Sequence, residues 1–188
     1  MLELNFTPFP VLETERLILR RKNENDVNEL FFLRSDERVM RYIDRERQKS
    51  TEETKEFLKN LDKAIDNNES LIWGIALKED PSTLIGSILL WKFQKEHFRA
   101  ETGYVLHPDH WRKGYMREAL HKVLQYGFNE LSLHSIEAII NPENNASAGI
   151  LESAGFIREA YFRENFHFKG KFLDTAVYSL LKREYKQS

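Results

Sequence analysis

The sequence contains no cysteine. This absence excludes disulfides, cysteine-ligated zinc, iron–sulfur clusters and a thiol nucleophile, and it fits a reducing compartment. No stretch approaches the roughly 18 apolar residues of a membrane-spanning helix. The first residues carry acids where a secretory signal would carry basic residues. We therefore expect a cytoplasmic protein with no membrane partner.

An excess of charge of one sign is also missing. Lys+Arg 28 against Asp+Glu 30 gives a formal net charge of −2, so bulk electrostatics provides no reason to expect a nucleic-acid partner. The chain has 188 residues, of which 41% are hydrophobic and 31% charged. This composition predicts one globular domain, 1–188, that buries a core without a metal or disulfide.

The first half of the chain alternates between helical and strand patterns. A strand is expected over 15–20, then a helix capped by Asp26, and then a helix that Ser50 or Thr51 opens. Between these helices, the mixed charges of 36–49 favour a mobile, solvated connection. An antiparallel meander is expected next, with strands over 71–78, 84–93 and 100–106.

The second half continues with helix, strand, helix and hairpin. A helix from about Met116 carries one apolar stripe, a strand covers 135–140, and a helix over 144–154 ends at Gly155. A hairpin turns at 169–171. The element order predicts an α/β (mixed α+β) domain around a central sheet.

The segment 101–120 carries the most chemical information, since it reads as a strand, a polar loop, a single glycine and a helix. A glycine just before a helix lets several main-chain N–H groups point to one place, where the helix dipole favours an anion. Arg112, Lys113 and Arg117 surround Gly114. These patterns indicate a local phosphate site, the alternative being basic side chains that are merely solvated. Neither G-x-x-x-x-G-K-[ST] nor G-x-G-x-x-G is present.

The run W-R-K-G-Y-M-R-E-A over 111–119 resembles motif A of the GNAT superfamily of acetyl-CoA-dependent N-acetyltransferases. More narrowly, it resembles the RimJ/RimL-like branch, which acetylates protein N-terminal amines. T-E-R-L-I-L-R over 14–20, N-N-A-S over 144–147 with the later Gly155, and residues between 163 and 184 match that branch in order. The resemblance covers nearly the whole chain.

This resemblance implies the GNAT acyl-CoA N-acyltransferase fold: a mostly antiparallel sheet, flanked by helices, that splays between its fourth and fifth predicted strands, 100–106 and 135–140. Pantetheine would pair with the first of these two strands, and the pyrophosphate of CoA would lie on the Gly114 loop. No metal is expected. The residues assigned to the cofactor are Tyr104, Val105, Leu106, Arg112, Lys113, Gly114, Tyr115, Met116, Arg117 and Asn144.

The same resemblance suggests catalytic roles. Glu101 is the candidate base, although a structural ion pair is the alternative. A main-chain N–H within 104–106 would receive the oxyanion. Family members often protonate the leaving thiolate with a tyrosine where this chain has Leu151, which leaves Ser147 as the substitute to test. Two further departures are Met116, where the pattern has Gly or Ala, and Arg112.

The leading functional hypothesis is acetylation of a protein N-terminal α-amine. With a pKa of about 7.7–8.0, such an amine is neutral about a third of the time at pH 7.5, whereas a lysine at about 10.4 is disfavoured by roughly 4 kcal/mol. The alternatives are a small amine (polyamine, aminoglycoside or amino acid) and a non-catalytic acyl-CoA-binding module. An aromatic strand over 161–168 is expected to be half core and half acceptor groove or subunit contact, so a homodimer stays open.

Overall fold

The computed structural model describes residues 1–186 and contains one eight-stranded sheet. Its spatial order is β1-β2-β3-β4-β5-β6-β8-β7, and only the β5–β6 pair is parallel. The sheet is therefore mixed and mostly antiparallel, as expected. The strands are β1 (Leu12–Glu13), β2 (Leu17–Arg20), β3 (Leu71–Leu77), β4 (Asp80–Gln94), β5 (Arg99–Leu106), β6 (Ser135–Ile140), β7 (Ile157–Phe168) and β8 (Lys171–Leu181).

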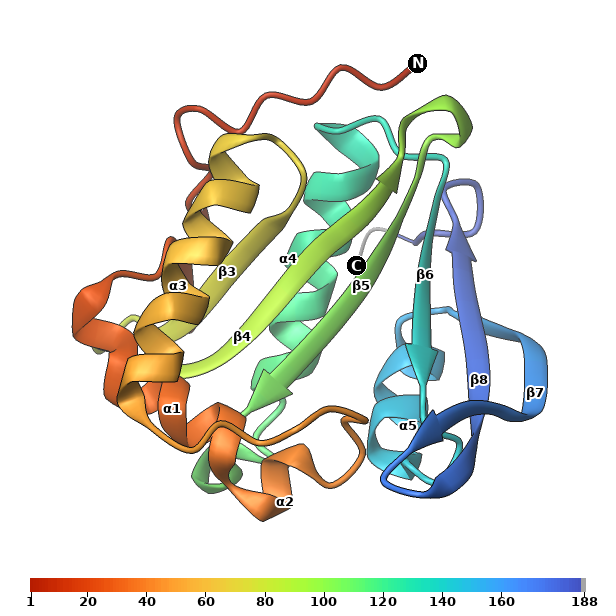
Figure 1. The fold of residues 1–188 in the computed structure, drawn as a ribbon. Coiled ribbons are helices and arrows are strands. Elements are labelled where there is room, and N and C mark those ends of the chain that lie inside the picture. The colour runs from red at the N-terminus through yellow and green to blue at the C-terminus, as the bar shows by residue number, and fades with distance from the viewer. Residues whose placement is uncertain (187–188) are drawn as a thin grey trace.

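Helices cover both faces of this sheet (Figure 1). The predicted apolar stripe of α4 packs against the strands, since Ala119, Leu120, Val123 and Leu124 are fully buried. On the opposite face, α1 and α3 enclose a second, smaller core. The helices are α1 (Val27–Ser35), α2 (Glu37–Met40), α3 (Thr51–Asp66), α4 (Tyr115–Asn129) and α5 (Asn145–Ser153), with short 3-10 turns at Glu24–Asp26, Lys95–His97 and Pro108–His110.

The ladder between β5 and β6 is short. It pairs Arg99 with Ser135, Ala100 with Ile136 and Glu101 with Glu137. Beyond these three pairs, β5 continues for five residues and β6 for three, and these residues do not pair with each other. Figure 1 shows the two strands diverging toward their C-terminal ends.

Two local expectations about the first half need correction. Segment 36–49 is not a solvated connection throughout: it contains α2, and Met40 is buried at 7% exposure. Asp26 precedes α1 as expected, but its carboxylate makes no capping bond to that helix. It accepts instead from the Arg20 guanidinium at 2.7 and 2.8 Å and from the Asn23 N–H at 2.8 Å. Ser50 caps α3, where its Oγ accepts from the Glu53 N–H.

The expectation that half of the aromatic residues of β7 lie in the core is wrong. Tyr161, Phe162 and Phe166 are between 41% and 50% exposed, and Phe168 is only partly buried. The physical reason is that β7 lies at the edge of the sheet, beyond β8. Across residues 1–186, no helix combines the length and the apolar character that crossing a bilayer requires.

Candidate active site

A cavity of ≈ 360 Å³ extends from the place where β5 and β6 separate to the inner sides of α1 and α3. Its floor is one face of the sheet, formed by side chains of β3 to β6. Its far wall comes from α1, α3 and the segment after α2. Among the residues predicted for the site, those that line this cavity are Glu101, Tyr104, Val105, Asn144 and Ser147.

Glu101 lies in the cavity wall, is 7% exposed, and accepts a hydrogen bond from Lys92 Nζ at 2.7 Å. Lys92 has a left-handed backbone (φ 48°) at an irregularity in the β4–β5 ladder. This bulge brings the ammonium beside the carboxylate. The ion pair named as the structural alternative is therefore present, with Lys92 as the partner, and the carboxylate still borders the cavity.

The hydroxyls of Tyr104 and Ser147 lie 3.0 Å apart, and both residues line the cavity. Ser147 lies in the first turn of α5, where its N–H donates to Asn144 Oδ1 at 3.1 Å. Asn144 thus caps this helix, which occupies part of its hydrogen-bonding capacity. Burial raises the pKa of Tyr104 to about 12, although its hydrogen bond with Ser147 opposes this shift.

The main chain of β5 presents free groups to the gap beside β6. His107 N–H donates to Ile85 O at 2.8 Å. Hydrogen-bonded residues alternate along an antiparallel ladder, so Val105 also bonds to β4. Tyr104 and Leu106 therefore direct their main-chain groups toward β6, where the short ladder does not reach them. The Leu106 carbonyl accepts from the indole of Trp111 at 2.7 Å.

Gly114 supplies the turn before α4. Its φ of 82° is a backbone conformation that glycine adopts without strain. Glu118 N–H bonds to Gly114 O at 3.1 Å, so the N–H groups of the preceding first-turn residues lack an intrahelical acceptor. These groups and the helix dipole suit an oxyanion. Arg112, Lys113 and Arg117 are exposed around the turn.

The side chain of Met116 does not belong to this anion site. It is 5% exposed and packs in the main core. The first turn of α4 directs this side chain toward the sheet. Only the main chain of Met116 is available to an anion. Tyr115 is half-buried, and the Arg16 guanidinium lies 4.6 Å from its ring centroid.

Sequence reasoning missed the contacts that hold this turn in place. Arg16 donates to Lys113 O at 3.0 Å, and its Nε donates to Glu118 Oε2 at 2.7 Å. Glu118 also accepts from Thr14 Oγ1 at 2.5 Å and from the Arg16 N–H at 2.9 Å. The T-E-R segment and the glutamate of motif A thus form one cluster. The family resemblance includes both the T-E-R segment and this glutamate, and that co-occurrence was the sequence signal that could have indicated their contact.

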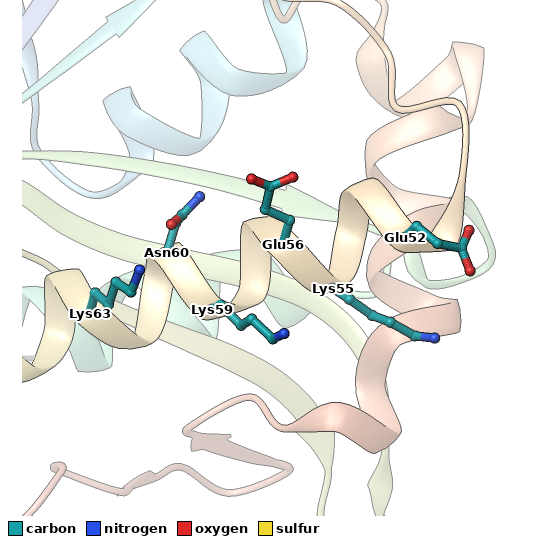
Figure 2. Close-up of a pocket in the computed structure, with 6 residues that line it drawn as sticks. All are labelled: Glu52, Lys55, Glu56, Lys59, Asn60 and Lys63. Atoms are coloured by element: carbon teal, nitrogen blue, oxygen red, sulfur yellow. The ribbon is translucent and has the colours of Figure 1, made fainter.

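A second hollow, on the outer side of α3, is not a candidate site. Figure 2 shows its lining side chains standing out from successive turns of that one helix. They alternate in charge, as on a solvated helix face. Because no second element faces them, they cannot enclose a ligand. The residues are Glu52, Lys55, Glu56, Lys59, Asn60 and Lys63.

Comparison with known proteins identifies the family. The profile described as "Acetyltransferase (GNAT) domain" matches residues 16–157. The uncharacterized N-acetyltransferase YoaA of Bacillus subtilis is 36% identical over 174 residues, which cover 93% of this chain and 98% of YoaA. The profile match includes the Gly114 turn and every residue that lines the cavity except Thr175.

Solved structures of acetyltransferases have the same fold as this chain. The GNAT acetyltransferase of Bacillus anthracis is 31% identical with a TM-score of 0.82, covering 93% of this chain and 100% of that one. The Vibrio cholerae spermidine N-acetyltransferase, in complex with CoA and spermine, is 26% identical with a TM-score of 0.80, and the match covers 92% of this chain and 99% of that one. The Vibrio fischeri ribosomal-protein-S5-alanine acetyltransferase shares the fold. It is 22% identical with a TM-score of 0.78, and the match covers 95% of this chain and 100% of that one. The chain belongs to the GNAT family of N-acetyltransferases as a RimJ/RimL-like member.

Proposed function

We propose that this protein transfers the acetyl group of acetyl-CoA to a primary amine, the N-terminal α-amine of a protein. The observation that carries the proposal is the cavity itself, because one space joins the unpaired main chain of β5, the Glu101 carboxylate and the Ser147 hydroxyl. Donor, base and acid are needed together in such a reaction. All three can act within this space.

The residues present fit CoA as the donor. The turn at Gly114 offers N–H groups to a pyrophosphate, and the main-chain groups of Tyr104 and the N–H of Leu106, which the β5–β6 ladder does not reach, offer an edge to an extended amide-containing arm. When bound, acetyl-CoA supplies an acetyl group activated as a thioester. The Leu106 N–H is our candidate donor to the carbonyl oxygen, where it would stabilise developing negative charge.

Glu101 accepts the proton that leaves the amine nitrogen as the C–N bond forms, directly or through one water. A carboxylate is a weak base, and the ion pair with Lys92 holds the carboxylate of Glu101 in place. A weak base suffices for an α-amine, whose pKa of about 7.7–8.0 leaves a usable neutral fraction near neutral pH. This match supports an α-amine over a lysine side chain.

Ser147 donates its hydroxyl proton to the CoA sulfur as the C–S bond breaks and the thiol leaves. The adjacent Tyr104 hydroxyl orients Ser147 and can resupply the proton, since the two oxygens are 3.0 Å apart. The high pKa of Tyr104 keeps that hydroxyl protonated at neutral pH. These hydroxyls argue against a module that has kept the fold and lost the chemistry.

A small amine is the second candidate acceptor, because helices close much of the cavity and the Vibrio cholerae structure holds spermine. The test is release of CoA thiol from acetyl-CoA with α-amine peptides, lysine side-chain peptides, spermidine and amino acids, followed by mass spectrometry of the product. We expect acetylated α-amines. Selective acetylation of spermidine would contradict the acceptor, and CoA binding by calorimetry without thiol release would contradict catalysis.

A further inference from the structure

The lining of the cavity carries more positive than negative charge. Its basic side chains are Lys22, Arg34 and Arg45, and its acidic side chains are Asp44 and Glu101. Glu101 is already neutralised by Lys92. Unmatched positive charge therefore lines the cavity.

Lys22 is the most unusual of these groups. It is 4% exposed, lines the cavity, and its Nζ has no hydrogen-bond partner within the described chain. Burying an ammonium without a partner is costly. Asp26, the nearby carboxylate, is already bound by Arg20 and the Asn23 N–H. No hydrogen bond within residues 1–186 thus offsets the cost of this burial.

Burial lowers the pKa of Lys22 to about 7. Asp26 and Asp62 raise this pKa, whereas Arg34 and Arg20 lower it further. The amine is therefore close to its midpoint at neutral pH, and a negative charge brought beside it would favour its protonated form.

Gly74 makes room for Lys22. A Cβ at Gly74 would lie 3.1 Å from Cγ of Lys22 and 2.5 Å from Cδ1 of Leu84, so only glycine fits beneath the lysine stem. Gly74, Ser87 and Val105 are register partners across β3, β4 and β5. At about 4.8 Å per strand, the Lys22 stem lies roughly 10 Å from Val105, at the opposite end of the same floor.

Arg34 provides a second donor in this region. Its Nε is buried and makes no hydrogen bond to any part of the chain that the structure describes. The guanidinium lies 3.6 Å from the ring centroid of Phe57, which holds it by cation–π stacking. Burial and the nearby Arg45 lower the pKa of Arg34 to about 10, so it remains charged at neutral pH.

We propose that Lys22 and Arg34 form an oxyanion subsite that selects acceptor amines bearing a carboxylate in the same molecule. This inference rests on the proposed function, since it requires the amine to enter this cavity. The carboxylate can belong to a free amino acid or to an acidic residue near a protein N-terminus. A polyamine would bring only positive charge to Lys22 and Arg34, so this subsite disfavours it.

Acetyl-transfer kinetics on matched acceptors test the subsite. We expect kcat/KM at least tenfold higher for peptides with glutamate at position two than for the same peptides with glutamine, and for L-glutamate than for its diamide. The peptide and amino-acid arms distinguish the two sources of the carboxylate. Lys22→Met should remove the preference by raising KM, whereas Lys59→Met, on the outer face of α3, should keep it. Equal rates in both arms would overturn the subsite while leaving the proposed function intact, whereas a preference for spermidine would overturn both the subsite and the proposed acceptor.

A binding measurement makes the test independent of catalysis. Glutarate, which has two carboxylates and no amine, should bind the full chain with proton uptake at pH 8, and Lys22→Met and Arg34→Met should each weaken binding at least tenfold in calorimetry. Using two variants guards against one that fails to fold. Absence of glutarate binding up to 50 mM, or unchanged affinity in both variants, would refute the subsite whatever the enzyme acetylates.

Discussion

The hydroxyl of Tyr104 lies 3.0 Å from the Oγ of Ser147, and this contact joins β5 to the first turn of α5. It is located where β5 has lost its pairing to β6 and where both residues line the cavity. Two neutral hydroxyls held together in a buried site can pass a proton without either one being ionised at neutral pH. The pair is therefore our candidate source of the proton for the leaving thiolate.

Loss of either hydroxyl should slow the release of CoA thiol. We expect Ser147→Ala to lower kcat by roughly 10²-fold and Tyr104→Phe by roughly tenfold, at the lower end of general acid contributions. Because the two groups act as one unit, the double variant should be no slower than Ser147→Ala alone. Steady-state thiol release measures all three variants. Losses that multiply in the double variant would show that the hydroxyls act separately.

Gly114→Glu should abolish binding of CoA, because the substitution places a carboxylate where the pyrophosphate is expected and forces a side chain into a left-handed conformation. We expect Kd to rise at least 100-fold in calorimetry, with a stability loss of about 1–2 kcal/mol. Gly149→Glu is the matched control, since Gly149 is exposed and has open space around it. Unchanged affinity in Gly114→Glu would remove the turn from the site.

Glu101→Gln should lower kcat/KM by roughly 10²-fold, chiefly below the pKa of the amine, where a proton must still be removed. Above that pKa the ammonium proton is already gone and only the proton lost as the C–N bond forms still needs a base, so the loss should shrink. The measurement is a pH–rate profile. Glu137→Gln is the control, because Glu137 forms a similar ion pair with Arg99 outside the cavity. A loss that does not vary with pH would return Glu101 to a structural role.

The helical and hairpin boundaries followed from the sequence because local patterns determine them. The stripe of α4, the stop at Gly155 (φ 94°) and the turn at Gly170 (φ 77°) each depend on residues close in sequence. Segment 36–49 was predicted wrongly for the converse reason. Its alternating charges resemble a solvated loop, whereas in the fold Met40 is buried and lines the cavity together with residues of β3 to β6 that are distant in sequence.

The site was predicted in part. Tyr104 and Ser147 were singled out separately, by resemblance and by elimination, but no sequence pattern states that residues 43 apart share a hydrogen bond. Lys22 was not singled out, because a lone lysine between a strand and a turn is ordinarily solvated. Its burial depends on Gly74, which lies on another strand.

The cluster around Glu118 predicts an acid-sensitive contribution to stability. Burial raises the pKa of Glu118, but the hydrogen bonds from Thr14 and Arg16 lower it below the usual value. A lowered carboxyl pKa stabilises the fold above about pH 4.5, and this stabilisation is lost as pH falls through the folded-state value. Glu118→Gln should cost about 1–2 kcal/mol at pH 7 and less at pH 3, measured by urea unfolding. Glu56→Gln, on exposed α3, should match the parent at both values.

Lys22 should cost stability in the protein alone, as a group reserved for a ligand does. Its pKa is about 7 when folded and 10.5 when unfolded, so between these values the unfolded chain binds the extra proton and stability rises with pH. Below about pH 7 the full cost applies, at most roughly 5 kcal/mol. Lys22→Met should remove this slope and raise the unfolding free energy at pH 7 by about 1–4 kcal/mol in urea titrations, with Lys59→Met unchanged. A less stable Lys22→Met protein at pH 7 would mean that the amine supports the fold, and its burial would then need no ligand.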